Sequence, residues 1–139
     1  MIIEAFTDGA SRGNPGESGI GIVARAGGRT VLEESGYIGR TTNNIAEYTA
    51  LLTLLHRIKA VPCERLIVHS DSELMVRQLA GTYKVKNPGL REYHERVRTL
   101  VRTLPFPVEI RHVPREKNRE ADRLANEGID SRIPVVEQY

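Results

Sequence analysis

Four acidic residues stand where the chain is expected to change from one element of secondary structure to the next. Asp8 and Asp71 each follow a short apolar run, whereas Glu47 and Asp122 each lie about one turn into a helical pattern. In sheets with parallel strands, sites form beyond the carboxyl ends of the strands, where helices begin. We therefore expect the four carboxylates to meet at one edge of a sheet.

Such a cluster needs a cation, because like charges held close together raise one another's pKa. Hard oxygen ligands select Mg²⁺ or Mn²⁺. Two of these ions about 4 Å apart can support an in-line phosphoryl displacement, in which one activates the attacking water and the other stabilises the leaving oxygen. The acidic residues thus indicate metal-dependent chemistry on a phosphate ester.

Each acid also has a structural explanation when it is taken alone. Asp8 followed by glycine is typical of a turn, and Asp71 followed by serine is typical of a helix cap. Asp122 suits the positive end of a helix dipole, and Glu47 could be a glutamate on a helix surface. Only the joint placement of the four residues favours a site.

The first third of the chain predicts an antiparallel meander. Residues 2–7, 19–26 and 30–38 read as strands, with a turn-rich stretch at 8–16 and a Gly-Gly turn at 27–28. The pattern then changes to a helical period. Apolar residues at 45, 48, 51, 52, 55 and 58 predict a helix over 45–60, preceded by capping residues at 41–44.

The remaining elements alternate between helices and strands. We expect a strand over 65–70, a short helix over 71–79, a helix over 90–104, a strand over 108–113 and a helix over 118–128. Strands joined through helices lie parallel, with right-handed crossovers. The predicted fold class is therefore α/β, with a five-stranded mixed sheet of a three-stranded meander plus two parallel strands, and helices on both faces.

Length and composition fit one globular domain. The chain has 139 residues, of which 40% are hydrophobic and 27% are charged, and we assign residues 1–128 to the domain and 129–139 to a tail. No stretch approaches the roughly 18 apolar residues of a membrane span. The single cysteine, Cys63, excludes an internal disulfide and a cysteine-based zinc site. We expect a cytoplasmic monomer with no membrane partner.

Positive charge is concentrated in one segment, although the net charge is only +2. Residues 77–102 hold seven basic and two acidic side chains. This run is typical of a solvated helix face, or of a surface that binds a polyanion.

Four motifs together resemble type 1 ribonuclease H, and they follow one another in that family's order. They are TDGASRGNPG at 7–16, TNNIAE at 42–47, HSDS at 69–72 and NREADRLA at 118–125. The resemblance covers nearly the whole chain, from about residue 2 to 128. It implies the ribonuclease H fold and an endonuclease that cuts the RNA strand of an RNA–DNA hybrid, leaving 5′-phosphate and 3′-hydroxyl ends.

The resemblance also implies roles for single residues. The catalytic ligands of two Mg²⁺ or Mn²⁺ ions would be Asp8, Glu47, Asp71 and Asp122. Contacts to the minor groove of the hybrid, where 2′-hydroxyls mark RNA, would come from Gly9, Asn14, Asn43 and Asn44. A pocket for a phosphate of the DNA strand would use Arg40, Thr42 and Asn87.

The sequence departs from the best-known members in three places. Many members have a histidine in the loop before the last helix, and here Arg115 is the expected occupant, with His112 as the alternative. The long basic handle helix is replaced by a short connector at 81–89, as in handle-less, archaeal-like members. Glu73 stands where many members have glutamine, which leaves that groove contact open.

Two other functions remain as alternatives at this point. One is a non-catalytic nucleic-acid-binding module on the same fold, since fold does not fix function. Four acids argue against it, because binding alone favours basic or neutral residues near phosphates. The other is a 3′–5′ exonuclease of the related superfamily. Its first motif is Asp-x-Glu, whereas here Ala10 takes the place of the glutamate.

Overall fold

Three antiparallel strands form the first third of the chain, as the alternating apolar pattern predicts. They are β1 (Ile2–Gly13), β2 (Gly16–Ala26) and β3 (Arg29–Thr41). β1 pairs with β2, and β2 pairs with β3. The computed structural model describes residues 1–136.

The second part of the chain adds two parallel strands and the helices that connect them. Its elements are α1 (Asn43–Ile58), β4 (Arg65–Ser70), α2 (Glu73–Leu79), α3 (Pro88–Thr103), β5 (Val108–His112), a 3₁₀ turn (Arg115–Lys117) and α4 (Arg119–Ser131). β4 is parallel to both β1 and β5, and the sheet order is β3-β2-β1-β4-β5. This confirms the predicted five-stranded mixed sheet.

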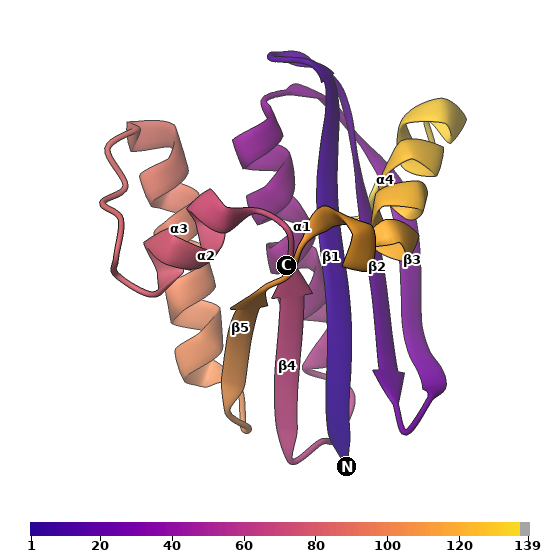
Figure 1. Ribbon diagram of the computed structural model, residues 1–139, viewed down its shortest axis with the longest axis vertical. Helices are drawn as coiled ribbons and strands as arrows, with labels where there is room; N and C mark the ends of the chain where they lie inside the picture. The colour runs from indigo at the N-terminus through magenta and orange to yellow at the C-terminus, as the bar shows by residue number, and fades with distance from the viewer. Residues whose placement is uncertain (137–139) are drawn as a thin grey trace.

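Helices cover both faces of the sheet. Figure 1 shows α1 behind the sheet, α4 in front of β2 and β3, and α3 to the left of β5, where it packs against α1. The main core lies between the sheet and α1, where the side chains of Ile20, Ile22, Leu51, Leu54 and Leu55 are fully buried. Among residues 1–136, no helix has the length and apolar character needed to cross a membrane.

β1 is longer than predicted, and this changes the place of Asp8. The sequence pattern predicts that the strand ends at residue 7, because the next residues favour turns. Instead, residues 8–13 continue along β2, whose first half is itself rich in glycine. The parallel ladder with β4 does end where expected, at the pair Thr7 and Ser70. Asp8 therefore lies inside β1, just past the point where β4 leaves it.

α4 packs unusually close to the sheet. A Cβ added to Gly21 of β2 would lie 2.1 Å from the main-chain oxygen of Ala121, so only glycine permits this approach. The helix also runs beyond the predicted end at residue 128, to Ser131. After it, the chain follows β3, since the Tyr37 amide donates to Ile133 O (2.8 Å) and the Val135 amide donates to Tyr37 O (3.1 Å).

The proposed division into residues 1–128 and 129–139 stays a prediction. Residues 137–139 of the predicted tail lie outside the described residues.

Candidate active site

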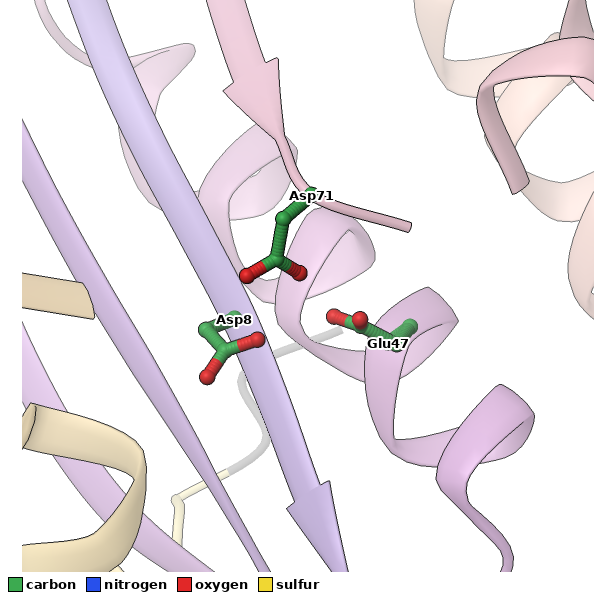
Figure 2. A group of neighbouring side chains, drawn as sticks. All are labelled: Asp8, Glu47 and Asp71. Atoms are coloured by element: carbon green, nitrogen blue, oxygen red, sulfur yellow. The ribbon is translucent and has the colours of Figure 1, made fainter. Parts of the chain in front are cut away.

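Three carboxylates converge at the edge of the sheet where β1 continues past β4. Asp8 comes from β1, Glu47 from α1, and Asp71 follows the last residue of β4. One ligand oxygen of each lies within 4.8 Å of those of the other two. Figure 2 shows the three side chains pointing toward one another. The topology therefore brings together residues that are far apart in the sequence, as predicted.

Glu47 is held by the main chain of β1. β4 has ended at this level, and the Gly9 amide donates to Glu47 Oε1 at 2.7 Å. α1 lies so close here that a Cβ on Gly9 would be 2.2 Å from the main-chain carbon of Ala46. The Asp8-Gly9 pair thus permits contact between β1 and α1, and it does not form the turn that the dipeptide alone suggests.

Asp122 lies beside Asp8, outside the group of three. It is in the first turn of α4, as predicted, and lines the same cavity of about 490 Å³ as the other three acids. Asn126, one turn later, donates to Asp122 Oδ1 at 3.4 Å and to its main-chain oxygen at 3.0 Å. All four predicted acids therefore share one cavity, with Asp122 on the side of α4.

The surroundings of the cluster disfavour the charged forms of two of its carboxyls, Asp8 and Glu47. Burial, and then the charges of Glu47 and Asp71, raise the pKa of Asp8 from 3.8 to about 9. Burial and the charge of Asp71 raise the pKa of Glu47 to about 8, although the bond from the Gly9 amide opposes this shift. Asp8 is only 5% exposed and Glu47 only 9%, so water screens them little. A set of buried carboxylate oxygens of this kind fits a hard divalent cation.

Several residues predicted to contact nucleic acid surround the acids. Gly9, Asn43 and Asn44 line the cavity. Asn14 lies at the tip of the β1–β2 hairpin, where its Oδ1 accepts a hydrogen bond from the Asn43 amide at 3.1 Å. The two predicted groove-contacting segments are therefore joined to each other.

The three residues of the predicted phosphate pocket do not line the acidic cavity. Arg40 lines a separate cavity of about 560 Å³ with Tyr37 and Tyr93. Thr42 caps α1 by accepting from the Ile45 amide, and Asn87 caps α3 by accepting from the Gly89 amide at 2.8 Å. The side-chain oxygens of Thr42 and Asn87 thus have structural partners, and the phosphate role of the three residues stays a prediction.

Arg115 lines the acidic cavity from the 3₁₀ turn that precedes α4. His112 is exposed at the end of β5 and is not among the residues that line this cavity. Of the two residues, Arg115 is therefore the one at the cavity, and its role there stays a prediction.

Sequence reasoning missed Asn118 and Asn126. Asn126 follows Asp122 by four residues, and this spacing places two side chains on one face of a helix. It could have been found from that spacing. Asn118 reads as an ordinary helix cap, and only its contact with β1 distinguishes it.

Comparisons with known proteins agree on one family. A family model described as "Reverse transcriptase-like" matches residues 6–128. Ribonuclease HI of Halobacterium salinarum is 40% identical over 129 residues, covering 92% of this chain and 64% of that protein. Ribonuclease H of Halorhodospira halophila is 33% identical, over 95% of each chain. The chain spans between 36% and 64% of the first curated relatives that it matches.

A solved structure is similar over almost its whole length. The crystal structure of LC11-RNase H1 in complex with an RNA/DNA hybrid has a TM-score of 0.87 and 43% sequence identity to this chain. The match covers 93% of this chain and 97% of that one.

Proposed function

The chain belongs to the ribonuclease H family, of the HI type, and from this premise we propose that it is a metal-dependent endoribonuclease acting on RNA–DNA hybrids. The observation that carries the proposal is the group formed by Asp8, Glu47 and Asp71, with Asp122 beside it in the same cavity. The hybrid bound by LC11-RNase H1 supports the choice of substrate.

The four acids are proposed to hold two Mg²⁺ or Mn²⁺ ions. When bound, the ions would activate the attacking water and stabilise the leaving 3′ oxygen. The water oxygen forms a bond to phosphorus, the bond from phosphorus to the 3′ oxygen breaks, and that oxygen takes a proton. The products are a 5′-phosphate and a 3′-hydroxyl. The carboxylates supply oxygen ligands and negative charge that offsets the charge of the cations.

The remaining residues are proposed to select and orient the hybrid. Gly9, Asn43 and Asn44 border the acids, and their main-chain and amide groups can approach 2′-hydroxyls in a minor groove. Asn14 holds the segment of Asn43 in place. Arg40 is suited to a phosphate of the DNA strand, because its guanidinium presents forked donors.

The test is cleavage of an end-labelled RNA–DNA hybrid with Mg²⁺. We expect internal cuts in the RNA strand by the wild-type protein and none by Asp71→Asn. That variant should still bind the hybrid in a fluorescence anisotropy titration, since loss of an acid does not weaken attraction to phosphates. Glu127→Gln is the matched control. It also removes one negative charge, but on an exposed part of α4 beside Arg123, and it should cut normally.

The outcomes separate the proposal from its alternatives. Binding without cleavage by the wild-type protein would favour the non-catalytic module. Products shortened stepwise from the 3′ end would favour an exonuclease. Cleavage by Asp71→Asn at a near wild-type rate would show that the acidic group is not the catalytic centre.

A further inference from the structure

Asn118 connects the two elements that carry Asp8 and Asp122. It is 1% exposed and lies just before α4. Its side-chain Nδ2 donates to the main-chain oxygen of Thr7 in β1 at 2.9 Å. Its own main-chain oxygen accepts from the Asp122 amide at 3.1 Å. Thr7 and Asp8 share a peptide bond, so a single residue lies between the backbones of two acids.

This use of an asparagine at a helix start is unusual. A residue at this position commonly turns its side-chain oxygen toward the first amides of the helix, and here no such side-chain bond is made. The side chain is directed to a strand 111 residues away in sequence. Its Oδ1 is buried and has no hydrogen-bond partner within residues 1–136. A buried polar atom without a partner is unfavourable. The hydrogen bond from Nδ2 to β1 is the contact that fixes this side chain in place.

The role of the Asn118 contact follows from the positions of the four acids. Asp8, Glu47 and Asp71 lie on elements that pair directly or share the Gly9 contact. Asp122 belongs to α4 and lies outside this group, so its distance from Asp8 depends on where α4 begins. The like charges of the buried Asp8 and the half-buried Asp122 push the two carboxylates apart. The bond from Asn118 to β1 is made by main-chain and neutral amide atoms, so it holds in every protonation state of the cluster.

We propose that Asn118 is a positioning residue for hydrolysis, and that its link between Thr7 and Asp122 sets the separation of the Asp8 and Asp122 carboxylates. The part of this inference that concerns hydrolysis rests on the proposed function. Without the link, the start of α4 moves away from β1 and Asp122 no longer lies in register with the other acids. A displacement of about 1 Å at a reacting centre can lower a rate roughly 10²-fold. Gly9, Asn43 and Asn44 are carried by other elements and keep their places.

The experiment compares Asn118→Ala with two control variants. Thr7→Val removes a buried hydroxyl that has no partner within the described residues, and it keeps the main-chain oxygen that Asn118 contacts. Leu124→Ala loosens the packing of α4 by truncating a side chain that is 5% exposed, and it leaves the Asn118 link intact. Three quantities are measured: kcat and KM on a labelled hybrid, the melting temperature without metal, and its rise with increasing Mn²⁺.

We expect Asn118→Ala to lower kcat by roughly 10-fold to 100-fold with KM within about twofold of the wild-type value. It should also need several times more Mn²⁺ for half of the maximal rise in melting temperature. Thr7→Val should match the wild type in both respects. Leu124→Ala should lose at least as much melting temperature as Asn118→Ala and keep kcat within about twofold.

Two results would overturn the inference. One is an unchanged kcat and Mn²⁺ response in Asn118→Ala, and the other is an equal loss of kcat in Leu124→Ala at an equal melting temperature. If Asn118→Ala does not fold, Asn118→Ser keeps a shorter donor and should give intermediate values. Full wild-type behaviour of Asn118→Ser would then contradict the role. A wild-type protein that does not cut the hybrid would refute the proposed function, while the Mn²⁺ titration would still test the link.

Discussion

Replacing Asp8 with asparagine should stabilise the metal-free protein, and the gain should grow as the pH rises. Asp8 is 5% exposed and shares its surroundings with Glu47, Asp71 and Asp122. The folded state therefore disfavours the charged form of this carboxyl, whereas the unfolded chain does not. The asparagine side chain has nearly the same size and carries no charge.

The size of the effect follows from the pKa shift. The pKa of Asp8 is about 9 in the folded protein and about 4 in an unfolded chain. Between these values the folded state holds a proton that the unfolded state has lost, so the free energy of unfolding falls as the pH rises. The slope is about 1.4 kcal/mol per pH unit for one such group. It sets an upper limit of about 4 kcal/mol on the gain in Asp8→Asn at pH 7, against about 1–2 kcal/mol at pH 5.

The assay is urea unfolding in the presence of a chelator at pH 5, 6, 7 and 8. Asp130→Asn is the control, because Asp130 is exposed on α4 and its hydrogen bond with Arg12 lowers its pKa. That variant should gain no stability at pH 7. Mg²⁺ at 100 times its dissociation constant should stabilise the wild-type protein by about 2.7 kcal/mol. Equal pH slopes for the wild type and Asp8→Asn would refute the reasoning, and so would a wild-type protein that saturating metal does not stabilise.

Three further predictions concern residues around the acids. Gly9→Ala should lower the free energy of unfolding by roughly 1–3 kcal/mol, because its Cβ would lie 2.2 Å from the main-chain carbon of Ala46. Urea unfolding at pH 7 measures this loss. An unchanged urea midpoint would contradict the close contact. Arg40→Ala should raise KM more than it lowers kcat in steady-state cleavage, and unchanged hybrid affinity would leave Arg40 as a solvated residue of β3. Lys84→Ala combined with Lys86→Ala should reduce the slope of log affinity against log salt by about one to two, because fewer phosphates are neutralised. Selectivity for the hybrid over duplex DNA should be retained. An unaltered slope would mean that these lysines contact no phosphate.

The order of the elements could be predicted from the sequence, because each has a clear period or boundary. The extent of β1 could not. Residues 8–13 are polar and glycine-rich, and they read as a loop. In the structure they pair with β2 through main-chain hydrogen bonds, which depend little on side-chain type. The end of α4 was misjudged for a related reason. A glycine such as Gly128 is typical of a helix end, but here it lies inside the helix, where a Cβ would meet the main-chain oxygen of Gly36 at 2.3 Å.

The four acids could be predicted because each stands near the end of an element, and topology alone brings such ends together. The role of Asn118 could not be predicted in this way. Its contact depends on how closely the start of α4 approaches β1, and the packing of Ala121 against Gly21 of β2 only brings the helix near the sheet. Local sequence patterns do not reveal the distance between the start of a helix and a distant strand. From the sequence, an asparagine before a helix is therefore interpreted as a cap.

The arrangement of neutral contacts around the acids explains how a repulsive cluster can exist before any cation binds. Asp8 and Glu47 are held where burial makes their charges unfavourable, and their mutual repulsion acts to separate β1 from α1. Repulsion between Asp8 and Asp122 acts in the same way between β1 and α4. The opposing contacts are the Gly9 amide to Glu47, the Asn118 amide to β1 and the close packing of α4 at Gly21. Two of these three use only uncharged groups, so a change in protonation or the arrival of a cation does not remove them. A cation that binds here would therefore meet ligands already in place, and its binding energy would not be spent on assembling them. Loosening the Asn118 contact should for this reason weaken metal binding even when all four carboxylates remain.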